Sequence, residues 1–581
     1  MKIIKSSTKE SNHLWMVLCF GVLGALFIVI SVVSYRQIAN EREWKSYDCL
    51  TSCDNIPLPV FSVPEGIYGQ PFELEINAPS GCDIYYTTDG STPTVRSRKY
   101  QKRITVDPNT NLNRDMMYIA TSLVWYPPMG RQSHSTVIRA RCFRAGVGYG
   151  KVKNVVYSAP DIGQHLGFHI VHILIEPDSL FSPTKGIYVL GEKYYSKKAM
   201  VEINQQPSSQ DWIYYPANYH QRGPKWTRPA TLILMDISGK TLFEQNINLC
   251  INGMGSRAFA EKSLRIMPDN KSDTVIRHPF FDELPDSTYK RLLLRNSGND
   301  VLYTLFQDAL VHRLANGTGV DLQAYTPSVL YINGNYWGIH NIREKQEENY
   351  LAAKYDVPLQ DISIVNYFEY FANHYTMNYG PESSLQSFEQ LLSFIRQNSL
   401  ADQTAYHAAC TQIDVDNFIE YMILQTFFAN LDWPGNNVRF YRFGRQTESM
   451  QQNGIDAGKW RWLFYDLDNS MNEPTINTFE RLRNEYAHNP VTQIFFGFME
   501  NAGFKEKFIG RYEYLVKNQL TSEKMSEQIN IFEARYRQEI ERQIARWREP
   551  RGIRYWRQSI EDMKDFAQKR PEIILEQIKY L

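Results

Sequence analysis

The stretch 423–470 constrains the fold of this chain more than any other, because its apolar segments end in polar side chains. An apolar, helix-like run ends at Asp432, and Asn437 follows after a short Pro-Gly loop. After a strand-like VRFYRF and a polar loop, a second strand, WRWLFYD, ends in the carboxylates of Asp466 and Asp468. A lone buried charge costs several kcal/mol, so these residues are poor core material. Carboxylate and amide oxygens are good ligands for a hard divalent cation.

The spacing of these residues adds to their chemistry. Asp432 and Asn437 form D-x-x-x-x-N, the spacing of the protein-kinase catalytic loop. In that loop the Asp positions the attacking hydroxyl and the Asn holds a magnesium ion, while a later strand supplies another metal-binding Asp. Asp466 is the candidate for that Asp here. The spacing alone is a weak signal, and its place between a helix and a strand that ends in D-x-D strengthens it.

The N-terminus predicts a membrane anchor. Residues 14–33 carry no charge, and a helix of that length spans roughly 30 Å, the thickness of a bilayer core. Lys2, Lys5 and Lys9 precede the stretch, so the sequence predicts a single anchor within 1–40 and places the bulk of the chain outside the cytoplasm. A cleaved signal peptide is the alternative, disfavoured by the length of the run and the lack of an A-x-A-like site.

Size and composition narrow the remaining possibilities. At 581 residues the chain is expected to hold two or three domains. Its 63 basic and 63 acidic residues balance, so nothing indicates nucleic acid as a partner. Cys49 with Cys53, and Cys82 with Cys142, are plausible disulfides in an oxidising compartment, and the sequence leaves their pairing open.

Residues 41–59 are predicted to be a linker and residues 60–160 a small β-sandwich. PFELEINA and TVIRARCFRAG alternate apolar and polar residues, as strands with one buried face do. IYYTTDGSTPT at 84–94, followed by IRARCFRAG, resembles the chitobiase C-terminal or fibronectin-associated sandwich module. The resemblance implies a spacer or docking role, with carbohydrate as a weaker candidate partner.

Two further motifs suggest phosphate contacts. GMGSRAFAEKSLRI is a glycine-bearing turn that enters a strand, and such a basic turn suits a phosphate, with Lys262 as its partner. An ordinary exposed hairpin is an equally good interpretation. Glu344 follows a hairpin turn at Asn333-Gly334 and is a candidate partner for Lys262, as kinases pair a strand lysine with a glutamate. A solvated charge cluster at a helix start is the alternative.

Taken in order, several motifs resemble those of the spore-coat protein H (CotH) family of atypical protein kinases. They are GMGSRAFAEKSLRI, LRNSGND, LYINGNYWGIHNIREKQEENYL, NLDWPGNNVRFYR and WLFYDLDNS. The resemblance covers 165–581 and implies an α+β, two-lobed kinase-like domain that follows the sandwich and the transmembrane helix. It also implies ATP with Mg²⁺, or alternatively Mn²⁺, and phosphorylation of serine or threonine in exported or surface proteins.

The resemblance assigns roles by position in this sequence. It implies Asp432 as the catalytic residue, the metal ligands Asn437, Asp466 and Asp468, and the ATP-binding residues Lys262, Glu344, Arg257 and Arg343. The long polar loop between Asn437 and Asp466 is a departure that leaves full activity open. Two alternatives remain. One is a non-catalytic surface scaffold or glycan-docking protein, and the other, ranked lower, is a carbohydrate-active hydrolase with Asp432 and Asp466 as its acid pair.

Overall fold

The computed structural model describes residues 52, 54–196, 209–284, 288–369 and 374–581. These residues form two compact units, and each unit is assembled from separate stretches of sequence. The first unit contains the described residues up to Pro64 together with Gln70–Asp107 and Thr136–Val156. The second contains Glu65–Gly69, Pro108–Ser135 and Tyr157–Leu581. The boundaries predicted at 60–160 and 165–581 stay predictions.

Short antiparallel strands build the first unit, as the alternating patterns predict. The strand β5 (Asp83–Thr87) pairs with β8 (Ser135–Arg144), in a register that places Ile84 opposite Cys142. The other strands in this part of the sequence are β1 (Val60–Phe61), β2 (Gly66–Ile67), β3 (Phe72–Leu74), β4 (Ile76–Asn77), β6 (Arg98–Lys99), β7 (Ile104–Val106) and β9 (Gly148–Ser158). Cys82 and Cys142 are free thiols, and Cys49 and Cys53 lie outside the described residues.

A nine-stranded sheet organises the second unit, in the order β17-β20-β16-β13-β12-β11-β10-β18-β19. The strands β10 and β18 pair in parallel, and every other neighbouring pair is antiparallel. Their bounds are β10 (His169–Leu174), β11 (Arg228–Met235), β12 (Thr241–Ile251), β13 (Leu264–Pro268), β16 (Leu292–Arg295), β17 (Tyr325–Thr326), β18 (Ser328–Ile332), β19 (Asn335–Ile339) and β20 (Asn341–Glu344). A separate pair, β14 (Ile276–Arg277) and β15 (Thr288–Tyr289), forms a two-stranded sheet.

The two faces of the nine-stranded sheet differ in chemistry. Leu264 and Ile266 of β13, and Leu292 and Leu294 of β16, belong to the hydrophobic core. Because successive strand residues point to opposite faces, Arg265 and Arg295 lie on the other face of the same sheet. At β13 and β16, one face of this sheet is therefore apolar and the other carries arginines.

The predicted hairpin turn at Asn333-Gly334 is present between β18 and β19. Both residues have positive φ, 49° and 83°, as the two central residues of a type I′ turn require.

A four-stranded sheet in the order β22-β21-β23-β24 follows in the sequence. Its strands are β21 (Ile362–Phe368), β22 (His374–Tyr379), β23 (Val438–Phe443) and β24 (Arg461–Trp462). Phe440 lies opposite Trp462, and Leu463 N donates to Arg439 O at 2.9 Å. The sheet thus aligns the segment after Asn437 with the segment before Asp466.

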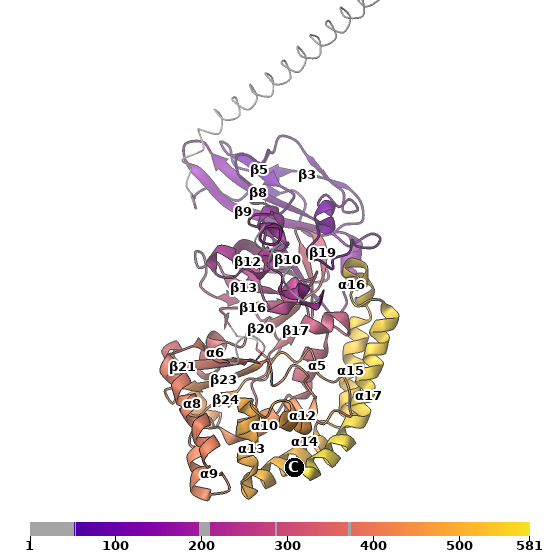
Figure 1. The fold of residues 1–581 in the computed structure, drawn as a ribbon. Coiled ribbons are helices and arrows are strands. Elements are labelled where there is room, and N and C mark those ends of the chain that lie inside the picture. Colours follow the sequence, from indigo (N-terminus) through magenta and orange to yellow (C-terminus); the bar gives the residue numbers. More distant parts are fainter. Residues whose placement is uncertain (1–51, 53, 197–208, 285–287, 370–373) are drawn as a thin grey trace, which may run out of the picture. The chain divides into compact units, whose positions relative to one another are not determined.

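Most of the remaining chain is helical, and the described helices have the following bounds. They are α2 (Pro177–Phe181), α3 (Gly191–Tyr195), α5 (Gln307–Leu314), α6 (Glu348–Tyr355), α8 (Glu382–Gln397), α9 (Gln403–Cys410), α10 (Val415–Phe427), α11 (Glu448–Gln452), α12 (Thr478–Asn484), α13 (Pro490–Met499), α14 (Ala502–Asn518), α15 (Ser522–Tyr536), α16 (Ile540–Trp547) and α17 (Ile553–Gln577). The long α17 packs along α15 and contacts α14 (Figure 1). The predicted α+β class is confirmed, and a two-lobed kinase arrangement stays a prediction.

The predicted membrane localisation is corrected. Across the described ranges, no helix combines the length and the apolarity needed to cross a bilayer. Residues 14–33, on which the prediction rested, lie outside the described residues. No described helix supports the predicted N-terminal anchor or the localisation derived from it.

Candidate functional site

The loop that carries Asp432 is bound directly to the loop that carries Asp466 and Asp468. Leu431 N donates to Asn469 O at 2.9 Å, and the side-chain amide of Asn469 donates to Asp432 Oδ1 at 3.2 Å. The preceding helix, α10, is buried along nearly its whole length and fixes where the first loop starts. The two acidic segments that the sequence singled out therefore meet in one place.

The pKa shift of Asp432 agrees with this placement of the two loops. Burial raises the pKa of Asp432 above its ordinary value, and the neighbouring carboxylate of Asp466 raises it further. The amide of Asn469 and the guanidinium of Arg481 act in the opposite direction. A carboxylate with a raised pKa beside another carboxylate is a recurring feature of functional sites.

Asn437 lies at the edge of the same site. Continuing the β23–β24 register by two positions beyond Arg439 and Leu463 places Asn437 beside Tyr465, next to Asp466. Asn437 is 8 % exposed and has a positive φ of 60°. Its side-chain amide makes no hydrogen bond with any described residue, so its oxygen is available to a ligand.

Arg295 contacts both carboxylates of the D-x-D pair, which lies in the loop after β24. Its Nη2 lies 2.7 Å from Asp466 Oδ1 and 2.9 Å from Asp468 Oδ2. Burial alone would lower the pKa of Arg295, but Asp466, Asp308 and Asp468 outweigh it and raise the pKa above its ordinary value. Arg295 is therefore a permanent cation within the acidic cluster.

Arg265 marks a basic face beside this cluster. It lies on β13 opposite Leu293 of β16, on the sheet face that also carries Arg295. Its guanidinium donates to Asn252 Oδ1 at 3.4 Å and forms no ion pair with a described residue. The pKa of Lys345 is lowered to about 8, chiefly by burial, with Glu347 opposing the shift and Arg439 and Arg265 adding to it. This excess of positive charge suits phosphate groups.

Lys262 lies in the protein interior, where its described contacts give the predicted phosphate role no support. Its side chain is fully buried, and its Nζ donates to Phe259 O and, at 2.9 Å, to Thr121 O. The rings of Tyr188 and Tyr219 flank the amino group. The proposed pair with Glu344 is not formed, because the Glu344 carboxylate accepts from Ala324 N at 3.1 Å. The alternation pattern could not reveal this, since Lys262 precedes the first residue of β13.

Lys262→Met should lower the free energy of unfolding by about 1–3 kcal/mol, because it leaves two buried carbonyl groups without a donor. Urea denaturation measures the loss, with the exposed Lys271→Met as the control. Nucleotide affinity should change little. A variant that is as stable as the wild type but no longer binds nucleotide would restore the phosphate role for Lys262.

Arg257 and Arg343 also have internal partners. Arg257 donates to the backbone carbonyls of Gly253, Tyr219, Gln221 and Ile251 at 2.6–3.3 Å. Arg343 pairs with Asp308 and donates to Gln323 Oε1 at 3.2 Å. Both arginines therefore hold the fold together, and their contacts give the predicted ATP-binding roles no support.

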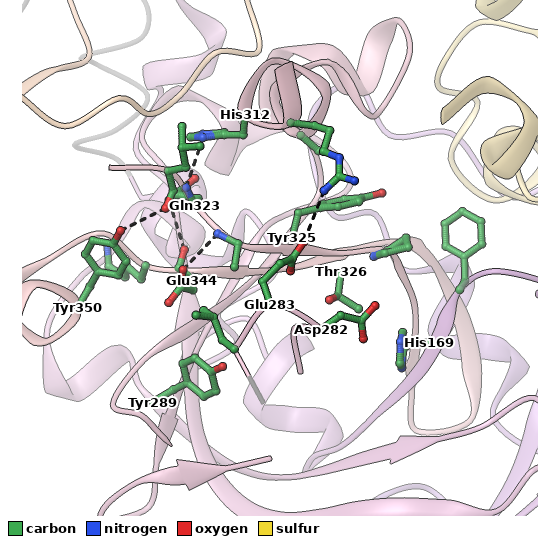
Figure 2. Close-up of a pocket in the computed structure, with 18 of the residues that line it drawn as sticks. His169, Asp282, Glu283, Tyr289, His312, Gln323, Tyr325, Thr326, Glu344 and Tyr350 are labelled. Atoms are coloured by element: carbon green, nitrogen blue, oxygen red, sulfur yellow. Dashed lines mark hydrogen bonds and ion pairs between the residues drawn. The ribbon is translucent and has the colours of Figure 1, made fainter. Parts of the chain in front are cut away.

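Glu344 lines a cavity of about 1140 Å³ that is separate from the carboxylate cluster. Figure 2 shows Glu344 among the lining residues, together with Tyr289 and Tyr325. Asp432, Asn437, Asp466 and Asp468 do not line this cavity.

Glu344 should make stability depend on pH. Burial raises its pKa from 4.5 to about 7. Between these values the folded chain binds more protons than the unfolded chain, so the free energy of unfolding falls as pH rises. Glu344→Gln should remove roughly 3 kcal/mol of this fall between pH 4.5 and 8. Urea denaturation at both pH values tests it, with the exposed Glu506→Gln as the control. An unchanged pH slope in the variant would contradict the assignment.

The residues present fit a magnesium ion. Asp466 is 34 % exposed at its side chain, and its Oδ2 makes no hydrogen bond within the described part of the chain. Among described residues no group of three or more His, Cys, Asp or Glu side chains is arranged around a metal position. Kinase-type sites bind Mg²⁺ through one or two carboxylates and complete the shell with phosphate oxygens and water, a pattern that a carboxylate such as Asp466 fits.

Sequence reasoning missed several residues of this site. Arg295 and Asn299 belong to the quoted LRNSGND motif, but no role was assigned to either residue. A charged residue directly at the end of the apolar run LLL was the available signal. Asn469 and Arg265 carried no signal of their own, because a polar residue after a strand and a basic residue within one are common.

Carboxylates and a free amide beside basic side chains are features of a kinase-like protein. A family model described as CotH kinase protein matches residues 249–574, more than half of the chain. The chain therefore belongs to the CotH kinase family. Residues 63–114 match the chitobiase/beta-hexosaminidase C-terminal domain, so both predicted resemblances are confirmed. A comparison with curated proteins finds no match.

Proposed function

We propose that this chain transfers the γ-phosphoryl group of ATP, in the presence of Mg²⁺, to a serine or threonine hydroxyl of a partner protein. The meeting of Asp432 with Asp466 through the Asn469 bridge is the observation that carries the proposal. Membership of the CotH kinase family supports the same class of reaction.

Each residue has one task in this proposal. Asp466 and Asn437 would hold the metal, and Arg265 with Lys345 would contact the phosphates from the basic face. Bound ATP and Mg²⁺ supply the transferable phosphoryl group and the charge that neutralises its oxygens. Asp432 would orient the acceptor hydroxyl and accept its proton, a role that its raised pKa favours.

The direct test is ATP-dependent phosphate incorporation by the purified full-length chain. Labelled γ-phosphate should enter the chain itself or an added protein, on serine or threonine, and chelation of divalent metal should stop the transfer. Absence of any metal-dependent transfer, across a panel of protein acceptors, would favour the alternative of a non-catalytic scaffold.

A further inference from the structure

Both carboxylate oxygens of Asp468 accept hydrogen bonds from protein donors. Its side chain is 4 % exposed. Oδ2 accepts from Arg295 Nη2 at 2.9 Å and from Asn299 N at 3.0 Å, and Oδ1 accepts from Asn299 Nδ2 at 3.3 Å. A Cβ atom at Gly298, where φ is +62°, would overlap Oδ2, so the loop lies directly against the carboxylate. This arrangement leaves no room for a hydrated cation at Asp468.

Arg295 is held on both sides. Its Nε faces Asp308 Oδ2 at 3.9 Å, and Asp308 is itself fixed by Arg343 and by Leu467 N, which donates to it at 2.9 Å. The guanidinium is therefore anchored by two buried carboxylates, Asp308 and Asp468. Its remaining contact is with Asp466, the exposed member of the cluster.

We infer that Asp468 is not a metal ligand but the anchor of Arg295, and that Arg295 is a positioning residue that leaves Asp466 as the one carboxylate open to a divalent cation. This inference rests on the proposed function. The site would then hold one protein-bound metal ion, through Asp466 Oδ2. The two carboxylates of the D-x-D pair would have different roles, because Asp466 would bind the metal and Asp468 would hold Arg295.

The charges of the cluster support one metal. Asp466 and Asp468 together carry two negative charges when ionised, and the guanidinium between them removes one. A second divalent cation close to Arg295 would meet like-charge repulsion at short range. Arg295 thus weakens cation binding at Asp468 and fixes the side chain of Asp466 through Oδ1, while Oδ2 stays free.

Mn²⁺ binding to the full-length chain, counted from the electron paramagnetic resonance of free Mn²⁺, tests the inference. The wild type should bind one Mn²⁺, and Asp466→Asn should lose it. Asp468→Asn should keep that site within about threefold of the wild-type affinity, even if its melting temperature falls. Loss of Mn²⁺ by folded Asp468→Asn, to the same extent as by Asp466→Asn, would overturn the inference and leave the proposed function intact.

Arg295→Gln separates positioning from a purely structural role. Removal of the guanidinium should raise Mn²⁺ affinity at least fivefold or add a second site, whereas simple damage to the loop would lower affinity. Arg295→Lys should restore wild-type binding. Unchanged or weaker binding by Arg295→Gln would contradict the inference. Absence of Mn²⁺ binding by the wild type would overturn this inference and the metal-dependent function together.

Discussion

Asp466→Ala should reduce ATP-dependent phosphate transfer by about 10³-fold or more, which corresponds to roughly 4 kcal/mol of transition-state stabilisation. The reason is that the half-exposed carboxylate of Asp466 has one oxygen without a protein partner among the described residues, and catalysis of this kind depends on positioning and charge neutralisation. Asp432→Asn keeps the shape of the loop but loses the proton acceptor, so a loss of roughly 10²-fold or more is expected.

Initial rates with labelled ATP measure both losses, and Mn²⁺ binding separates them. Asp466→Ala should lose metal binding, whereas Asp432→Asn should keep it. Asp416→Asn on α10 is a matched control, because this carboxylate is 76 % exposed and pairs only with Lys507 at the surface. The fold of Asp466→Ala should persist, since Asp468 and Asp308 still hold Arg295. Wild-type rates in both variants would refute the proposed site.

Arg570→Met should lower the free energy of unfolding by about 4 kcal/mol or more. The fully buried guanidinium donates to Thr426 O, Phe427 O, Pro474 O and Ile476 O at 2.6–2.8 Å. Thr426 and Phe427 end α10, where the last carbonyls of a helix lack partners within the helix. Methionine fills much of the space but donates to none of these oxygens, and each buried acceptor left unpaired costs about 1–3 kcal/mol.

Urea denaturation followed by far-ultraviolet circular dichroism measures this loss. Arg557→Met is the matched control, because Arg557 lies on the same helix, α17, with an exposed side chain. Activity should fall together with stability, since the end of α10 leads directly into the loop of Asp432. Stability within 1 kcal/mol of the wild type would show that these four contacts contribute little net energy.

The sequence predicted the meeting of Asp432 and Asp466 because an apolar helix and, further along the chain, an apolar strand-like segment each end in polar side chains. It also predicted the Asn333-Gly334 turn, since that pair tolerates the positive φ values that a tight hairpin needs. These predictions depend on local chemistry, which spacing and residue type record well.

The sequence could not show which residues pack against each face of the nine-stranded sheet. Alternation separates Arg265 from Leu264 but does not say that Lys262, just before the strand, is enclosed by Tyr188 and Tyr219. Likewise, the D-x-D pair gave no sign that Arg295 would contact both of its carboxylates, because these contacts join segments far apart in the chain. The role of a residue therefore depends on long-range contacts, which its position in a motif does not show.

The discontinuous makeup of the second unit bears on how this protein can be shortened. A fragment that began at residue 165 would omit Pro108–Ser135, which supplies the Thr121 carbonyl to Lys262 and the Asn113 amide to Asn333 O. A fragment limited to 249–574 would also lose β10 and β11, two inner strands of the nine-stranded sheet. The residues matched by the family model are thus fewer than the residues that build the second unit and its core.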